Sequence, residues 1–418
     1  MGKLIAIVIF SILFVLIDLY VYQAVKTSIN GLSSGWKKFF FVLFWGITAF
    51  SIISLVIINT VDLEPISKNL RRFLMVVLVI IYFSKIFGVV TLLLDDIYNA
   101  GVWVYHKFFP LSEAQAPKPG DMPRSKFIAT TALAAMAVPV SAMGFGIISG
   151  AHNYRLRKRT VYLPNLPAAF DGIRIGQLSD IHTGSFFNRK AVHRGIELFM
   201  TEKPDVVFFT GDLVNDVATE VGEYKDILSR VKAPLGVYST LGNHDYGDYK
   251  GWSNPDLKRK NLADLIQVHH EMGWDILMNE NRTLKVDGEE IAILGIENWG
   301  AGRFSKYGKL DEAYKGIEDK PVKLLLSHDP SHWDAQVRKE YEDIDMMFAG
   351  HTHGFQFGVE IANFKWSPSK YIYKQWADLY HEGNQYLYVN RGFGFLGYPG
   401  RIGIMPEVTI IELKKGQA

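Results

Sequence analysis

The sequence contains no cysteine in its 418 residues. Disulfide bonds and thiolate metal ligands are therefore excluded, and any metal site must be built from oxygen and nitrogen atoms. Because a chain without cysteine persists on either side of a membrane, the redox compartment is left open. An excess of one charge is also lacking, since the formal net charge is +2. We therefore expect no nucleic-acid partner held by bulk charge.

Long hydrophobic runs, by contrast, fill the first third of the chain. Four of them reach the ~20 residues that a membrane-spanning helix needs, and they lie at residues 4–24, 39–58, 73–94 and 127–149. A cleaved signal peptide has a shorter apolar core followed by small residues, so we interpret the first run as an uncleaved span. The sequence thus predicts a transmembrane helical domain over residues 1–152, with a loop at 110–123. Near-equal numbers of Lys and Arg flank the two sides, so the orientation stays open.

Charged residues within and directly after these spans have two interpretations each. Asp18 and Lys85 lie inside the first and third spans, within roughly 5 Å of the same depth at a helical rise of ~1.5 Å per residue. They either reach the helix ends or form an intramembrane pair. The basic residues at 155 and 157–159 follow the fourth span and face lipid headgroups, either as a solvated stop or as a lipid-binding patch.

A carboxylate and an imidazole follow the first strand predicted beyond the spans. The apolar run at 173–175 predicts a buried strand, and Asp180 and His182 come shortly after it. Residues i and i+2 of a strand point the same way, so both side chains leave its end together. Oxygen and nitrogen ligands of this kind suit zinc, manganese or iron.

Four later blocks also place metal-ligand side chains after apolar strands. They supply Asp212, then Asn243, His244 and Asp245, then His328, and finally His351 and His353. Ligand-type residues at five strand ends predict one site, because ligands of open α/β sheets gather at the carboxyl ends of the strands.

Between these blocks, strand-like and helix-like segments alternate, which predicts an α/β layered domain. Strands are expected at 173–175, 206–209, 236–240, 291–296, 323–326, 346–348, 386–389 and 408–413. Helices are expected at 190–203, 221–231, 262–272 and 333–341. The third of these helices carries His269 and His270, which we expect to be solvated.

The order Asp-x-His, Gly-Asp, Gly-Asn-His-Asp, His, Gly-His-x-His resembles the calcineurin-like metallophosphoesterase superfamily. The resemblance covers residues 153–418 and implies a layered β-sandwich flanked by helices as the catalytic domain. With the preceding spans, the chain resembles the membrane-anchored bacterial type. That resemblance implies a multi-pass protein of the bacterial inner (cell) membrane.

By this resemblance, two divalent metal ions (Mn, Fe or Zn) would occupy the site, with the carboxylate of Asp212 between them. The first metal would be held by Asp180, His182, Asp212 and His353. The second would be held by Asp212, Asn243, His328 and His351. His244 would protonate the leaving oxygen, and Asp245 would orient His244.

The chain becomes rich in aromatic residues after Gly354, with Trp366 and Trp376 among them. This stretch either covers a sheet edge or forms a rim that accepts an apolar substrate or touches the bilayer. Arg391 lies in a turn like that of membrane-anchored relatives and could contact a phosphate, since guanidinium groups suit phosphate oxygens. Arg401 is a weaker candidate for the same contact.

The resulting hypothesis is a membrane-bound, metal-dependent phosphoesterase that hydrolyses a phosphoester or pyrophosphate bond. A lipid-linked phosphoester or pyrophosphate is the leading substrate, and membrane lipids are the expected partners. The alternatives are a phosphodiesterase or phosphatase acting on a soluble substrate, and a non-catalytic binding module of the same fold. Metal identity, substrate and oligomeric state are not determined by the sequence.

Overall fold

The computed structural model describes residues 2–61, 68–109, 124–362 and 364–417. The loop predicted at 110–123 lies outside these residues. The chain divides into two compact units, an N-terminal unit, Met1–Gly144, and a C-terminal unit, Phe145–Ala418.

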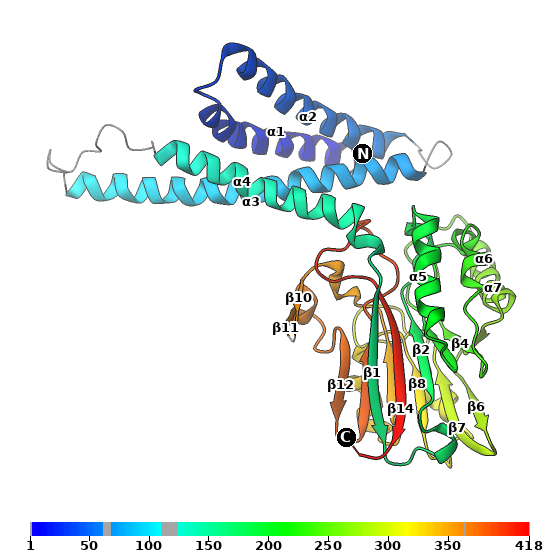
Figure 1. The fold of residues 1–418 in the computed structure, drawn as a ribbon. Coiled ribbons are helices and arrows are strands. Elements are labelled where there is room, and N and C mark those ends of the chain that lie inside the picture. The colour runs from blue at the N-terminus through cyan, green and yellow to red at the C-terminus, as the bar shows by residue number, and fades with distance from the viewer. Residues whose placement is uncertain (1, 62–67, 110–123, 363, 418) are drawn as a thin grey trace. The chain divides into compact units, whose positions relative to one another are not determined.

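The N-terminal unit is built from long apolar helices (Figure 1). They are α1 (Gly2–Ser28), α2 (Ser34–Thr60), α3 (Lys68–Phe108) and α4 (Arg124–Ile148), the last of which ends in the C-terminal unit. Four helices of the described chain are long and apolar enough to cross a membrane, namely Leu4–Ser28, Ser34–Thr60, Leu70–Phe108 and Lys126–His152. The predicted helical domain of four spans is thereby confirmed, and the third helix is much longer than the predicted run at 73–94.

The two charges inside the spans form a buried pair. Nζ of Lys85 donates to Oδ1 of Asp18 over 2.5 Å, and both residues are buried. The hydroxyl of Thr48 donates to Oδ2 of Asp18 over 2.6 Å, and that of Tyr82 does so over 3.1 Å. Of the two interpretations, the intramembrane pair is therefore the correct one, and it joins α1, α2 and α3.

The C-terminal unit contains two six-stranded sheets and one two-stranded sheet. In order across the first sheet, the strands are β1 (Arg155–Leu163), β14 (Glu407–Lys415), β2 (Arg174–Leu178), β3 (Val206–Thr210), β4 (Val237–Thr240) and β5 (Asp275–Ile276). Across the second they are β12 (Asp378–Glu382), β13 (Gln385–Val389), β9 (Met346–Ala349), β8 (Lys323–Leu326), β7 (Glu289–Gly295) and β6 (Glu280–Val286). The small antiparallel sheet pairs β10 (Val359–Ile361) with β11 (Phe364–Trp366).

Helices and turns connect these strands. The α-helices are α5 (Arg189–Thr201), α6 (Lys225–Leu228), α7 (Pro255–Met272), α8 (Leu310–Tyr314) and α9 (Arg338–Glu340), which follows the π-helix η6 (Trp333–Val337). The 3-10 helices are η2 (Gly150–His152), η3 (Ala168–Phe170), η4 (Thr183–Ser185), η5 (Ala218–Val221), η7 (His353–Gln356) and η8 (Pro368–Tyr371).

The two large sheets pack face to face around one apolar core. This core joins Val161 and Phe208 of the first sheet to Leu324 and Phe348 of the second. A second core lies between the first sheet and α5, α6 and α7, which Figure 1 shows along that sheet. A third joins the second sheet to α8 and η6. The layers are therefore helix, sheet, sheet and helix, which confirms the predicted α/β sandwich flanked by helices.

Within each large sheet, the strands that precede the sequence blocks run parallel. β2, β3 and β4 are parallel neighbours, and so are β8 and β9. Their carboxyl ends therefore meet at one edge of the sandwich, where the residues that follow them can converge.

Candidate metal centre

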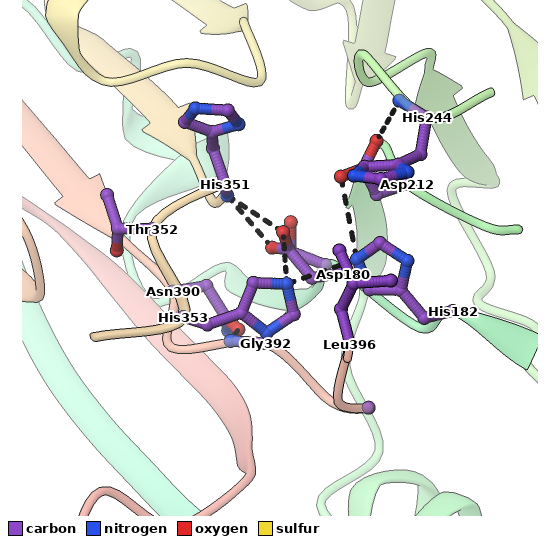
Figure 2. Close-up of polar contacts among 12 residues, drawn as sticks. Asp180, His182, Asp212, His244, His351, Thr352, His353, Asn390, Gly392 and Leu396 are labelled. Carbon is purple, nitrogen blue, oxygen red and sulfur yellow. Dashed lines mark hydrogen bonds and ion pairs between the residues drawn. The ribbon is translucent and has the colours of Figure 1, made fainter. Parts of the chain in front are cut away.

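Five loops at the carboxyl ends of the strands bring the predicted ligand residues together in one cluster, in which all but the half-buried His351 are buried. Figure 2 shows Asp180, His182, Asp212, His351 and His353 of this cluster. Asp180 and His182 follow β2, Asp212 follows β3, Asn243 follows β4, His328 follows β8, and His351 and His353 follow β9. Backbone hydrogen bonds tie the loops together. The N–H of Asp180 donates to the carbonyl of Gly211 over 2.9 Å, and the N–H of His182 donates to the carbonyl of Asp212 over 3.1 Å.

One group of ligand atoms consists of Asp180, His182 and His353. One atom from each side chain lies within 4.8 Å of the other two. Nε2 of His353 is 3.2 Å from Oδ1 of Asp180 and 3.1 Å from Nε2 of His182. Both oxygens of Asp180 also accept the backbone N–H of His351, at 2.9 and 3.0 Å.

A second group consists of Asp212, His328 and His351, with the same 4.8 Å spacing. Nε2 of His328 is 3.1 Å from Oδ2 of Asp212, while its Nδ1 donates to the carbonyl of Thr210 over 2.6 Å. The amide oxygen of Asn243 joins this group, 2.8 Å from Nδ1 of His351.

The carboxylate of Asp212 faces both groups. Its Oδ2 is 3.5 Å from Nε2 of His182 in the first group and 3.1 Å from Nε2 of His328 in the second. Its Oδ1 accepts the backbone N–H of His244 over 2.9 Å, which fixes the orientation of the carboxylate. One carboxylate thus lies within reach of both groups of ligand atoms.

The backbone of the cluster is strained. Asp180, His182, Asp212, His351 and His353 have φ between 49° and 68°, a left-handed region that residues other than glycine rarely adopt. Twelve non-glycine residues of the described chain have positive φ, and five of the twelve are these ligand residues. Such strain persists where the surrounding structure enforces it, and it clusters at functional sites.

Two glycines of the motifs allow the loops to approach closely. A Cβ atom at Gly350 would lie 2.0 Å from Oγ of Ser179 and 2.1 Å from Oδ2 of Asp180. A Cβ atom at Gly242 would lie 2.2 Å from Oδ1 of Asp212. Any larger residue at either position would displace one of the two carboxylates.

Charges in the cluster shift one another's pKa values. Burial raises the pKa of Asp212, but His328 and its neighbouring histidines outweigh burial and hold that pKa well below its usual range. Asp180 beside His353 has a lowered pKa for the same reason. Burial lowers the pKa of His182 to about 3. Burial opposes the charge of His328, but Asp212 outweighs burial and raises the pKa of His328 to about 10. A divalent cation bound at the cluster would therefore displace this proton, because metal ligands must be deprotonated.

These residues fit divalent metal ions in both donor type and arrangement. The set consists of two carboxylates, an amide oxygen and imidazoles, which suits Mn, Fe or Zn. Nδ1 of His351 lies 2.8 Å from the amide oxygen of Asn243, and its Nε2 lies 2.8 Å from the hydroxyl of Tyr373.

His244 lies beside the cluster and lines the cavity that adjoins it. Its Nδ1 is 2.8 Å from the backbone carbonyl of Asn215, which can only accept, so Nδ1 carries a proton. Its ring centroid is 5.0 Å from that of His182. Nε2 is therefore the nitrogen that is available to a substrate.

The predicted role of Asp245 has no direct hydrogen bond behind it in the described structure, where its carboxylate accepts none from the ring of His244. It instead accepts backbone N–H groups from Asp212 and Leu213, both at 2.8 Å, and from Gly242 at 2.9 Å. Burial and the charge of Asp212 raise the pKa of Asp245 to about 7. Asp245 therefore holds the loops after β3 and β4 together, and the carbonyl of Asn215 orients His244.

The placement of Arg391 argues against the predicted phosphate contact. Its side chain is fully buried and pairs with Glu407 at 2.6 Å, Glu360 at 2.9 Å and Asp378 at 3.2 Å. It is not among the residues that line the cavity beside the cluster. Arg401 is also buried, and its Nη2 lies 3.2 Å from Nδ1 of His353, so it supports that ring from behind.

A cavity of about 560 Å³ adjoins the cluster. Its wall includes Asp212, Asn243, His244, His351 and His353. Most of the remaining wall is aromatic, with Tyr249, Phe304, Phe355, Tyr373 and Tyr398. Among the described residues that line it there is no lysine or arginine.

Three residues of this site, Tyr249, Tyr373 and Asn215, were not assigned to it from the sequence. The hydroxyl of Tyr249 accepts from Nδ2 of Asn243 over 2.8 Å, which fixes the amide so that its oxygen faces His351. Tyr373 contacts His351, and Asn215 orients His244. Only Tyr373 had a signal, because it belongs to the aromatic stretch after Gly354.

Comparisons with known families agree with this architecture. Residues 3–151 match the family described as "Probable Calcineurin-like phosphoesterase, transmembrane domain", and residues 173–355 match the calcineurin-like phosphoesterase family. The chain therefore carries a calcineurin-like phosphoesterase domain, joined to a transmembrane domain of the kind found with such phosphoesterases. It is a phosphoester hydrolase and a multi-pass membrane protein.

Curated relatives come from bacteria and animals. A transmembrane protein with metallophosphoesterase domain from Danio rerio is 29% identical over 68% of this chain, which spans 63% of that relative's length. The uncharacterized metallophosphoesterase YkuE of Bacillus subtilis is 28% identical over 68% of this chain and 94% of its own length. The phosphodiesterase YaeI of Escherichia coli is 27% identical over 69% of this chain and 98% of its own length. The bacterial cell membrane stays a prediction for this chain.

Proposed function

We propose that this protein hydrolyses a phosphodiester bond of a lipid-linked substrate at a centre of two divalent metal ions. The observation that carries the proposal is that both ligand groups and His244 adjoin one cavity with an aromatic wall. A relative of this chain is named a phosphodiesterase, which supports a diester as the reacting group.

The first metal would be held by Asp180, His182, Asp212 and His353. The second would be held by Asp212, Asn243, His328 and His351. When bound, the two ions would lower the pKa of a water molecule and offset the negative charge on the phosphoryl oxygens. The chain itself holds the ligands rigidly, through strained loops and through the backbone N–H groups that bind Asp180 and Asp245.

His244 supplies the proton for the leaving oxygen. Its Nδ1–H is engaged by the carbonyl of Asn215, so the exchanging proton resides on Nε2. Because the imidazole packs against the rings of His182 and Tyr249, its position relative to the phosphate is fixed by packing. Proton transfer from such a positioned group contributes a rate factor of about 10²–10⁴.

The wall of the cavity favours a substrate with one negative charge and apolar substituents. Without lysine or arginine among its described lining residues, the cavity has no side chain to pair with a second phosphate. A phosphodiester brings one charge to the metals, whereas a pyrophosphate or a nucleotide brings more. Tyr249, Phe304, Phe355, Tyr373 and Tyr398 supply apolar surface for the rest of such a substrate.

The test is a substrate panel assayed with the full chain in lipid nanodiscs and Mn²⁺. It comprises a phospholipid diester, bis(p-nitrophenyl) phosphate, p-nitrophenyl phosphate and a lipid pyrophosphate, with Asp212→Asn as the inactive control. We expect kcat/KM to be highest for the lipid diester and lowest for the pyrophosphate. A higher value for a soluble monoester would contradict the lipid-diester proposal, and no turnover with two bound metals would favour the binding-module alternative.

A further inference from the structure

The small sheet of β10 and β11 reverses the usual polarity of a surface sheet. A strand exposed on one face normally turns its apolar side chains inward and its polar side chains outward. Here Ile361 and Phe364 form a cross-strand pair whose side chains are 70% and 62% exposed. Their neighbours in the next register position, Glu360 and Lys365, turn inward.

Inward-pointing charges hold this sheet against the large sheets of the C-terminal unit. Glu360 pairs with Arg157 at 2.7 Å and with Arg391 at 2.9 Å. Nζ of Lys365 donates to the carbonyl of Ala377 over 2.6 Å and lies over the ring of Tyr380. The outward orientation of the apolar side chains is therefore fixed by buried partners.

The exposed apolar side chains continue into the adjoining segment. We define the apolar surface as Phe357, Val359, Ile361, Phe364, Tyr371 and Ile372, all of which are exposed. Tyr371 and Ile372 are 73% and 70% exposed, and the exposed Lys370 lies over the ring of Tyr371 at 5.2 Å. Exposed apolar side chains that gather on one segment of the chain mark an interaction site, and tyrosine beside lysine is typical of the headgroup level of a membrane.

The tryptophans of this stretch contribute less than the sequence suggested. Trp376 is buried against Ile404, and Trp366 is half-buried. A membrane-facing role for this segment therefore depends on Ile361, Phe364 and Tyr371.

We propose that the apolar surface inserts into the interface of the lipid bilayer that the chain spans. Only residues 149–154 separate the end of α4 from the first strand of the C-terminal unit, so this unit stays within reach of the membrane. Phe355 lies next to the apolar surface in the chain and lines the cavity. Insertion would therefore bring the cavity to the lipid, as the proposed lipid-linked substrate requires. Insertion itself can be measured without turnover.

The absence of cysteine allows a direct test with the full chain. Ile361→Cys and Tyr371→Cys each carry a single spin label in nanodiscs of phosphatidylglycerol and phosphatidylcholine. Leu257→Cys, on α7 and 48% exposed, is the matched control. Accessibility is measured to oxygen, which concentrates in lipid, and to a nickel chelate, which stays in water.

We expect the ratio of oxygen to nickel accessibility to be several-fold higher at residues 361 and 371 than at residue 257. Equal ratios at all three positions would overturn the proposal. Spin–spin broadening between labels of different chains, with low access to both reagents, would also overturn it and would identify a second copy as the occupant. None of these readouts depends on activity, so they separate this inference from the proposed reaction.

Discussion

Two buried clusters of charge in the C-terminal unit differ in how their carboxylates are neutralised. Around Arg391, the carboxylates of Glu360, Asp378 and Glu407 are paired with guanidinium groups at 2.6–3.2 Å. Around Asp212, the neighbours are histidines and no arginine or lysine pairs with this carboxylate in the described structure. Arginine is charged at every physiological pH, whereas a buried histidine is readily neutral.

The positive charge of the arginine cluster is thus permanent, whereas the imidazoles of the histidine cluster can give up their protons to a bound cation. The two clusters also differ in access, because the histidine cluster lines the cavity and the arginine cluster does not. A buried carboxylate indicates a metal site when the groups around it can give up their protons.

The largest expected effect is that of removing the shared carboxylate. Asp212→Asn takes away one charge and one ligand atom from both groups, so kcat should fall by orders of magnitude and at least one metal should be lost. The matched control is Glu360→Gln, which removes a carboxylate from the arginine cluster and should retain both metals. Full metal content and normal turnover in Asp212→Asn would refute the two-metal interpretation.

His244→Ala should reduce kcat by about 10²–10⁴, the range typical of general acid–base catalysis, while both metals stay bound. The loss should be smaller for a diester with a very acidic leaving group, because that group needs no proton. Steady-state kinetics with two leaving groups, together with metal analysis, measure this. If metal is lost with the rate, His244 is a ligand.

In the arginine cluster the expected effect is on stability. Arg391→Met leaves the buried Glu407 without its 2.6 Å partner, and breaking a buried pair in this way costs about 3–5 kcal/mol. Thermal unfolding in detergent should show a lower Tm, partly restored in Arg391→Met with Glu407→Gln. The folded fraction should keep its metals, and a selective loss of lipid turnover at unchanged Tm would restore the phosphate-contact hypothesis.

A smaller effect is expected on the thermal stability at acid pH. Burial opposes the charge of Asp378, but Arg159 and Arg391 outweigh it and hold its pKa below the usual range. Its stabilisation is therefore fully present above the unfolded pKa of about 3.9 and is lost as the pH falls through the lower, folded value. Asp378→Asn should flatten the decline of Tm between neutral and acid pH, and an unchanged slope would contradict this assignment.

The sequence sufficed for the ligand cluster because each ligand-type residue directly follows a strand. Parallel strands end at a common edge, so adjacency in sequence became proximity in space without further information. The roles of Asp245 and Arg391 could not be derived in this way. A motif places a residue in a loop, and the direction of its side chain depends on partners far along the chain.

Strand β1 illustrates the same limit. Its basic residues suggested a segment facing lipid headgroups, yet Arg157 pairs with Glu360 and Arg159 with Asp378, each about 200 residues away. His269 was expected to be solvated, and it is buried with Nδ1 2.9 Å from the hydroxyl of Ser239. A local sequence pattern does not reveal that a charged or polar residue is buried or paired when its partner lies far along the chain.

The most direct test of the central claim is the metal content of the purified full chain. Wild-type protein loaded with Mn²⁺ and freed of excess metal should contain two ions per chain by mass spectrometry, and Asp212→Asn should contain fewer than two. Glu407→Gln, the matched change in the arginine cluster, should still contain two. A wild-type protein that retains one ion or none, while folded, would contradict the account.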